Sequence, residues 1–592
     1  MRHATLSAWL RTTLGDTPEW VRIVLGFAAV VVGIVLVLRP WTSLSAIVVL
    51  AVVALIVSGI GELAIARQSR LPWLTALAGV ALICGGLIAL AWPQISVGVL
   101  AVIVGIAMLA VGAARCAAGF RARTDARVAA IVGGLATVIF GLLVLAWPTV
   151  TLFVIAVVFG ARTAMFGLGL VIDAITHRTG IAPVAAGPRS RWRRIGAAAG
   201  AALALVVALA LLLVTVALHA ATPAAPGAFY RATAADISGP PGTVIRTQPI
   251  AGLTPTSTGY RVLYVSTGYD GRPAAVSGVI FVPDGPAPAG GRNVVDITHG
   301  TTGVASNCAP SLVANQSTTP VANFGGAAFL DAGDVVAATD YQGLGTAGPH
   351  PYLIGAAAAM DALDIVRAAH NLPQAHASTT FVVWGHSQGG QASLFTGELA
   401  ASYAPDLHLK GVAAGAPVPN LEQILKNNIA SVSGRVLISY ALTAWAATYR
   451  LDLASIVTPL AAPLMRQIAT SCLSSPDLLG ALPDALALGT TFFTHDPWTV
   501  APWKDIISKN DPGQTKIAVP MLITQGAIDP TVAPQLTRQL VTRLCAFGQP
   551  VDFDLMPGVA HADGGSRAAP MVEAWTAARF AGTPAPSVCA SG

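Results

Sequence analysis

The chain has 592 residues, of which 54% are hydrophobic and only 10% are charged, with a mean hydropathy of +0.67 and a formal net charge of +6. This composition is too apolar, and the chain too long, for one soluble domain. The basic residues cluster at the ends of apolar runs, where they set membrane orientation, so the positive charge does not indicate nucleic-acid binding. The sequence therefore predicts a membrane part followed by a soluble part.

The first part is predicted to be an all-α polytopic membrane bundle. Apolar runs of about 20 residues, long enough to cross a bilayer core, follow one another up to residue 217. We expect residues 1–20 to form a cytoplasmic N-terminus, 21–175 a six-helix domain, 176–194 a basic cytoplasmic loop and 195–217 a seventh span.

The six helices are predicted to form three helical hairpins, which turn at Pro40, Pro93 and Pro148. A glycine lies seven residues before each proline and another lies nineteen after it, at positions Gly33, Gly86, Gly141, Gly59, Gly112 and Gly167. Small residues permit close helix contact, and proline ends a helix where its missing N–H is tolerated. These hairpins resemble the HdeD-like acid-resistance membrane family over roughly residues 20–175, and the resemblance carries no catalytic motif.

The charges of the loops predict the membrane orientation, and one charge within a predicted span suggests a functional residue. Basic loops alternate with neutral ones, so we expect the N-terminus inside and everything after the seventh span outside. Arg162 falls near the middle of the predicted sixth span, where a charge is costly unless it faces the bundle interior or water. Arg162 is therefore a possible intramembrane functional residue; the alternative is an arginine that snorkels or binds a backbone carbonyl.

The six cysteines are divided between the two parts. Cys84 and Cys116 accompany apolar helices and are interpreted as packing residues. The other four, an even number that suits two disulfides in an oxidising compartment, are Cys308, Cys472, Cys545 and Cys589. The sequence alone leaves three pairings open.

A Pro/Ala linker at 218–228 precedes the predicted soluble domain, residues 229–592. Apolar runs rich in β-formers alternate there with helical stretches such as 356–370 and 388–401; the runs are NVVDITHG, DVVAATD, TTFVVWGHS, LKGVAAGAP and VPMLITQG. This alternation predicts a parallel sheet with helices on both faces.

The stretch GHSQG, residues 385–389, lies between the run TTFVVW and a helical stretch. A G-x-S-x-G motif in this context predicts a nucleophile elbow, in which Ser387 is lifted clear of the sheet. A serine hydroxyl needs a base, and the base needs a carboxylate to orient it. Asp529 and His561 follow two later strands in the chain order that this fold requires, so the three residues are predicted to follow three successive strands.

Other residues compete for these roles. Asp563 follows His561 in the same loop and is interpreted as a cap of the next helix. His386 is interpreted as part of the elbow, pointing elsewhere, whereas His495 and Asp496 follow no strand and are interpreted as surface loop residues.

A developing oxyanion needs two N–H donors. Gln388, directly after the nucleophile, is expected to supply one. The loop HGTTG after the NVVDIT strand resembles the HGGG-type oxyanion loop, and we expect Thr301 to supply the other. The alternative for this glycine-rich stretch is a plain turn.

The motifs DITHGTTGVASNCAPS, ATDYQGLGTAGPHPYL and VVWGHSQGGQASL, with the Asp529 and His561 loops, resemble the secretory lipase family over most of residues 225–590. The resemblance implies an α/β-hydrolase with a helical cap at about 417–515, hydrolysis of acylglycerols or other carboxylic esters, and no cofactor. It also implies that Cys308 pairs with Cys472 and Cys545 with Cys589. The apolar cap sequence suits an acyl chain or a bilayer, or it forms the cap's own core.

The sequence thus predicts a multi-pass cell-membrane protein with an extracytoplasmic serine hydrolase that cleaves lipid or other carboxylic esters through an acyl-enzyme. Its expected partners are the ester substrate and the membrane, without cofactor, metal or nucleic acid. One alternative is an acyltransferase that uses the same residues, because both reactions pass through the same intermediate. Another is a membrane stress or transport protein with an accessory hydrolase domain.

Overall fold

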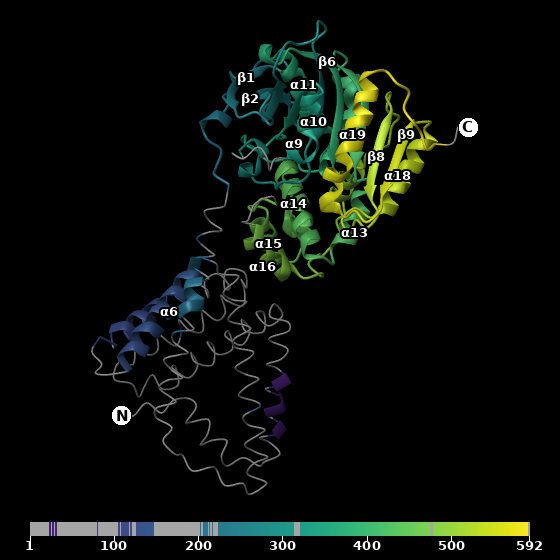
Figure 1. Ribbon diagram of the computed structural model, residues 1–592. Coiled ribbons are helices and arrows are strands. Elements are labelled where there is room, and N and C mark those ends of the chain that lie inside the picture. Colours follow the sequence, from purple (N-terminus) through teal and green to yellow (C-terminus); the bar gives the residue numbers. More distant parts are fainter. Residues whose placement is uncertain are drawn as a thin grey trace. The chain divides into compact units, whose positions relative to one another are not determined.

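A computed structural model of the chain divides into two compact units, Met1–Ala217 and Leu218–Gly592. In the second unit the structure describes residues 223–312, 320–473 and 478–589. In the first unit it describes 126–146, most of 105–120 and isolated helical positions (Figure 1). The division falls at the end of the predicted seventh span.

Two helical segments of the first unit pack closely. Helix α6 (Ala126–Ala146) lies against the helical residues of 105–120. A Cβ added at Gly112 would lie 2.8 Å from the backbone oxygen of Gly134, and one added at Gly141 would lie 3.0 Å from the facing backbone. Two of the predicted small residues therefore do permit close helix contact. The contact joins neighbouring predicted hairpins rather than the two arms of one hairpin.

Much of the predicted membrane architecture lies outside the described residues. This holds for the three proline turns, the basic loop 176–194, Cys84 and Arg162. Cys116 is described and lies within the helix contact, where its thiol faces the backbone oxygen of Ile131 at 3.6 Å. Among the residues that the structure describes, no helix is both long and apolar enough to cross a membrane.

The described part of the second unit contains a nine-stranded sheet in the order β1-β2-β3-β5-β4-β6-β7-β8-β9. Its strands are β1 (Val244–Ile250), β2 (Ser257–Thr267), β3 (Pro273–Pro283), β4 (Arg292–Thr298), β5 (Val335–Thr339), β6 (Ala377–His386), β7 (His408–Gly415), β8 (Met521–Gly526) and β9 (Val551–Met556).

The sheet is mixed, so the prediction of a parallel sheet is wrong for its first strands. β4 to β9 pair in parallel, whereas β1, β2 and β3 form antiparallel pairs and β3 pairs antiparallel with β5. Short turns connect β1 to β2 and β2 to β3, and a connection without a crossover helix can only reverse the chain direction.

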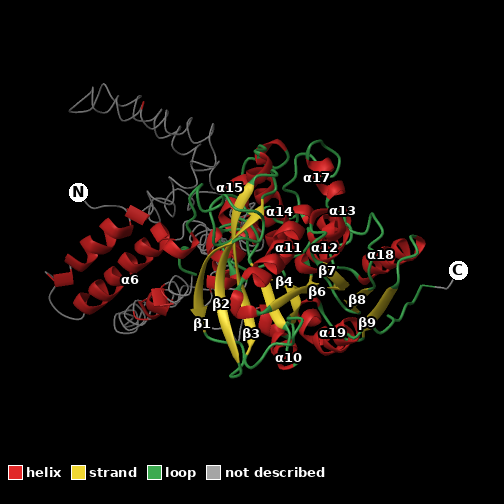
Figure 2. Ribbon diagram, turned by 90° about the horizontal axis from the view of Figure 1, so that it is seen from above, coloured by secondary structure: helices red, strands yellow, loops and turns green. Residues whose placement is uncertain are grey.

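Helices cover both faces of the sheet, as predicted (Figure 2). One face carries α11 (Gly355–Asn371), α12 (Gln388–Tyr403) and α18 (Pro534–Ala546). The other carries α9 (Pro320–Asn323), α10 (Gly326–Asp331) and α19 (Gly564–Phe580). Because the central strands are buried on both sides, they read as nearly continuous apolar runs in the sequence.

A helical cap is inserted between β7 and β8 and gathers at one end of the strands (Figure 1). It consists of α13 (Leu421–Asn428), α14 (Val432–Tyr449), α15 (Ala461–Ile468), α16 (Leu478–Leu488) and α17 (Trp503–Lys509). Its apolar side chains form a separate core around Tyr440 and Trp445, both fully buried. Most of the cap's apolar sequence is therefore its own core, while Leu460 and Leu486 remain exposed.

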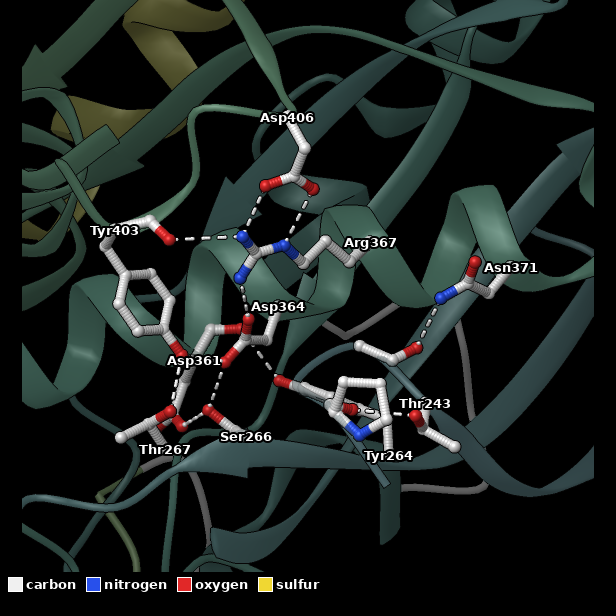
Figure 3. A network of polar contacts seen from close by, with 12 residues as sticks. Thr243, Tyr264, Ser266, Thr267, Asp361, Asp364, Arg367, Asn371, Tyr403 and Asp406 are labelled. Atoms are coloured by element: carbon white, nitrogen blue, oxygen red, sulfur yellow. Dashed lines mark hydrogen bonds and ion pairs between the residues drawn. The ribbon is translucent and has the colours of Figure 1, made fainter. Parts of the chain in front are cut away.

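A buried polar network fixes α11 against β2 (Figure 3). The hydroxyl oxygen of Ser266 lies 2.8 Å from one carboxyl oxygen of Asp361 and 2.8 Å from one of Asp364. A hydroxyl group carries a single proton, so one carboxyl must donate the second hydrogen bond. Arg367 pairs with Asp364 at 2.9 Å, whereas burial raises the pKa of Asp361 to about 7. The extra proton therefore belongs to Asp361, whose other oxygen accepts the Gln342 N–H at 2.8 Å in the loop after β5.

We expect Asp361→Asn to flatten the pH dependence of stability. The folded-state pKa of Asp361 is raised from 3.8 to about 7. Between these two pH values the carboxyl loses its proton in the unfolded state but keeps it in the folded state, so the wild-type fold loses stability as the pH rises. Asparagine keeps both hydrogen bonds and does not titrate. Between pH 5 and pH 8, thermal unfolding should show the wild type losing on the order of 2 kcal/mol more than the variant.

The exposed Asp331→Asn variant is the matched control and should follow the wild type at every pH. Parallel profiles for wild type and Asp361→Asn would contradict the protonated state of Asp361.

Candidate functional site

Ser387 occupies a strained turn between β6 and α12. Its φ of 61° and ψ of −121° lie in a region that non-glycine residues rarely adopt. A Cβ on Gly385 would lie 2.2 Å from the hydroxyl oxygen of Thr298, and one on Gly389 would lie 2.0 Å from the Thr298 carbonyl oxygen. Both glycines are therefore required for the close approach of β4 to the turn, which holds the serine hydroxyl at the carboxyl end of the sheet.

Ser387, His561 and Asp529 form one hydrogen-bonded line. His561 Nε2 lies 2.9 Å from Ser387 Oγ, and His561 Nδ1 lies 2.7 Å from Asp529 Oδ2. The three residues follow β6, β9 and β8, respectively. The prediction of three successive strands is wrong in one detail, because β7 lies between β6 and β8 and leads into the cap instead.

The carboxylate of Asp529 is fixed on both oxygens. Oδ1 accepts the backbone N–H groups of Thr531 at 2.8 Å and Val532 at 2.9 Å, and Oδ2 also accepts the Gln525 side-chain amide at 3.1 Å. Burial raises the pKa of Asp529, but the hydrogen bond and charge of His561 and the two backbone donors outweigh it and lower the pKa below its usual value. An ionised carboxylate therefore faces Nδ1 and fixes the orientation of the imidazole ring.

Gln525 is a residue that the sequence interpretation missed. It lies in β8, donates to Asp529 and accepts a hydrogen bond from the Thr537 hydroxyl at 2.6 Å. The available signal was an amide side chain in the otherwise apolar run VPMLITQG, since a buried polar group in a central strand needs partners.

His386 corrects the sequence interpretation, which had its side chain pointing elsewhere. Its ring centroid lies 4.8 Å from that of His561, and only 7% of the residue is exposed. Gly564 leaves room for it, since a Cβ there would lie 2.6 Å from His386 Nε2. Burial, then the neighbouring His561, lowers the pKa of His386 to about 3 against the opposing effect of Asp529. His386 is therefore a neutral ring packed against the proposed base.

The remaining competitors lie away from this line. Asp563 occupies the N-cap position of α19, as interpreted, although its side chain makes no capping hydrogen bond. His495 and Asp496 are exposed in a loop of the cap. Within the described residues, no group of three or more potential metal-ligating side chains occurs.

The two expected N–H donors flank Ser387. Gln388 is the first residue of α12, where backbone N–H groups have no acceptor within the helix. Thr301 lies in the loop after β4, and its hydroxyl hydrogen-bonds with that of Tyr352 at 2.8 Å. Thr301, Gln388 and Ser387 line one small cavity. The two residues predicted to supply the N–H donors therefore border a common space beside the serine.

The disulfides join Cys308 to Cys472 and Cys545 to Cys589, the pairing that the family resemblance implies. The first connects the loop after β4 with the cap, and the Leu473 N–H donates to the Thr302 carbonyl oxygen at 2.7 Å beside it. The Thr301 loop is thus tied to the cap by a covalent bond and a backbone hydrogen bond.

Comparison with known proteins supports both predicted resemblances. Residues 314–587 match the family model of the secretory lipases, a stretch that contains Ser387, Asp529 and His561. Residues 24–77 and 77–142 match two copies of a short repeat of unknown function, within the region predicted to consist of helical hairpins.

Three curated relatives match part of the chain at low identity. Lipase A of Arthroderma benhamiae is 28% identical over 232 residues, covering 36% of this chain and 48% of the relative. Trichothecene C-3 esterase of Fusarium sporotrichioides is 29% identical over 230 residues, covering 35% and 49%. A Mycobacterium tuberculosis protein named a "probable inactive lipase" is 31% identical over 194 residues, covering 31% and 43%. The chain thus spans less than half the length of these relatives.

Among solved structures, lipase A of Candida antarctica superposes with a TM-score of 0.53 at 19% identity, covering 61% of this chain and 87% of that chain. At this identity the likeness concerns the fold. Together with the mixed sheet, the helices on both faces and the inserted cap, it shows that the second unit has the α/β-hydrolase fold.

Proposed function

We propose that this chain is a membrane-tethered serine hydrolase that cleaves carboxylic esters with Ser387 as nucleophile, His561 as general base and acid, and Asp529 orienting His561. The observation that carries the proposal is the hydrogen-bonded line from the serine hydroxyl through both ring nitrogens to an ionised carboxylate. The secretory-lipase match and the relatives named lipase or esterase support the same reaction class.

The proposed reaction begins when Ser387 Oγ attacks the ester carbonyl carbon and its proton passes to His561 Nε2. The electron pair of the carbonyl bond moves to its oxygen, which the N–H groups of Thr301 and Gln388 stabilise. Collapse of this intermediate breaks the carbon–oxygen bond to the alcohol, and His561 returns the proton to the departing oxygen. Water, deprotonated by His561, then attacks the acyl carbon; collapse of this second intermediate breaks the carbon–oxygen bond to Ser387, and His561 returns the proton to Ser387 Oγ.

The tether is proposed from the first part of the chain. Its apolar runs and the match to a repeat region that resembles the HdeD-like family support a membrane domain, and its basic loops favour an inside N-terminus. The two disulfides of the second unit favour an oxidising compartment for the hydrolase. An extracytoplasmic hydrolase satisfies all three observations.

We expect Ser387→Ala to abolish ester hydrolysis by the full-length protein, because the substitution removes the hydroxyl that would form the acyl-enzyme. Release of p-nitrophenol from p-nitrophenyl butyrate should fall by about 10⁴-fold or more. The exposed Ser402→Ala variant, on the same helix, should retain the wild-type rate.

Equal negligible rates in wild type and Ser387→Ala, with both proteins folded, would overturn the hydrolase proposal. An acceptor alcohol in the same assay distinguishes the rival reaction. Ser387-dependent formation of a new ester in place of free acid would favour acyl transfer.

We expect Asp529→Asn to lower kcat by about 10³–10⁴-fold. An amide N–H at this position can donate to Nδ1 of His561, which favours the tautomer with the proton on Nε2, and Nε2 then cannot accept the proton of Ser387. Asp563→Asn, a neighbouring carboxylate without a side-chain capping bond, should change kcat by less than about twofold. Comparable losses in the two variants would exclude Asp529 as the orienting group.

Alkaline phosphatase fusions in a bacterial host test the proposed topology, because the phosphatase is active only outside the cytoplasm. Fusion after residue 185, in the predicted cytoplasmic loop, should be inactive, and fusion after residue 225, beyond the predicted seventh span, should be active. The reverse pattern would place the hydrolase in the cytoplasm.

A further inference from the structure

Two cavities of very different size meet at Ser387. The larger has a volume of about 410 Å³ and is lined by Ser387, His386, His561 and Phe324, among others. The smaller has a volume of about 40 Å³ and extends from Ser387 beneath the cap. An ester carbonyl placed at Ser387 must send its acyl part into one of them and its alcohol part into the other.

The position of His561 assigns the two sides. In the proposed reaction His561 delivers its proton to the oxygen of the departing alcohol, so the alcohol must lie on the side where His561 is accessible. His561 lines the larger cavity and not the smaller one, whereas Gln388 lines the smaller cavity and not the larger one; Thr301 lines both. The alcohol therefore occupies the larger cavity and the acyl chain the smaller one.

The smaller cavity limits the length of the acyl chain. Its volume is about a tenth of that of the larger cavity, 40 Å³ against 410 Å³, so it leaves room for only a short group. This space suits an acyl group of about two to four carbons. Its walls are aliphatic and come mostly from the cap, with Leu421, Leu425, Ile438 and Ala441 all at most 3% exposed.

One wall of this cavity, at Tyr352, is held in place. Tyr352, on the loop before α11, accepts the Trp445 ring N–H on its backbone oxygen at 2.8 Å, and its own hydroxyl bonds with Thr301. Its ring packs edge-on against Tyr440 at 6.5 Å. Tyr352 thus contacts two fully buried aromatic residues of the cap core, so a longer chain cannot push it aside without disrupting that core.

The larger cavity combines apolar and polar lining. Phe324, Leu437 and Pro310 provide apolar surface, while Asn307, Asn323 and Ser433 provide hydrogen-bonding groups. A bulky alcohol that carries its own hydroxyl or carbonyl groups fits this lining better than a plain hydrocarbon does.

We propose that the protein selects short-chain acyl esters, of about two to four acyl carbons, of bulky and partly polar alcohols. This inference rests on the proposed ester hydrolysis and adds the substrate class. The specificity-determining residues are Ile438 and Ala441 of α14, which line the smaller cavity.

The test compares p-nitrophenyl acetate, butyrate, octanoate and palmitate with the full-length protein. We expect kcat/KM for butyrate to exceed that for octanoate by about 100-fold or more, since a single misfitting methylene in an apolar pocket already costs about tenfold. Ile438→Ala should lengthen the smaller cavity and so raise the ratio of kcat/KM for octanoate to that for butyrate about tenfold or more. Ala441→Val should fill part of the smaller cavity and so lower the ratio of kcat/KM for butyrate to that for acetate about tenfold.

Ile456→Ala is the matched control. It makes the same chemical change in the cap core, at a fully buried residue that does not line the cavity. It should leave the chain-length ratio unchanged even if it lowers stability. Should Ile438→Ala fail to fold, the Ala441→Val profile decides the question alone.

The two proposals fail in different ways. Ser387-dependent cleavage of octanoate or palmitate at rates equal to butyrate would overturn the short-chain assignment and leave ester hydrolysis standing. The same shift of the ratio in Ile438→Ala and Ile456→Ala would show that the cavity does not hold the acyl chain. Absence of Ser387-dependent cleavage of every ester would overturn the hydrolase proposal itself.

Discussion

The contact between Thr298 at the end of β4 and the turn around Ser387 is the constraint on which the rest of the site depends. The Thr298 hydroxyl oxygen lies within hydrogen-bonding distance of the carbonyl oxygens of Gly389, at 2.9 Å, and Trp384, at 3.2 Å, and of the Ser393 hydroxyl, at 2.7 Å. These bonds draw β4 so close to the turn that only glycine fits at 385 and 389. Holding Ser387 at a positive φ costs about 1–3 kcal/mol, which the packing of two central strands offsets.

Because the strained turn projects Ser387 beyond the carboxyl edge of the sheet, the other groups need only lie in loops that end at the same edge. The loops after β8 and β9 supply Asp529 and His561, and the loop after β4 supplies Thr301. Hydrogen bonds to the buried carboxylate of Asp340 hold one of these loops in place. Asp340 accepts hydrogen bonds from the Ser311 backbone N–H and from the hydroxyls of Ser277 and Ser311, which ties the segment after β4 to β3.

The sequence predicted those features that short stretches encode. The apolar runs marked β4 to β9, and the glycines around Ser387 marked the turn, because both depend on neighbouring residues. Of the antiparallel strands that were missed, β1 is partly exposed and lacks a continuous apolar run, whereas β2 and β3 contain the buried apolar stretches VLYV and VIFV, which were an available signal. The contact of His386 with His561 was also missed, since it depends on how β6 and the start of α19 pack in three dimensions. Cavity size depends on still more distant segments.

The cap connects substrate selection with the geometry of the proposed catalytic residues. It enters after β7 and leaves before β8, so the chain passes from the cap into the strand whose following loop carries Asp529. Asn428 of α13 donates to the Thr531 carbonyl oxygen at 2.8 Å, and the Thr531 N–H in turn donates to Asp529. The acyl cavity is bordered by the same Asn428 and Thr531. We therefore expect a substitution that reshapes this wall to reach the Asp529 carboxylate through Asn428 and Thr531, which would couple the proposed chain-length preference to turnover.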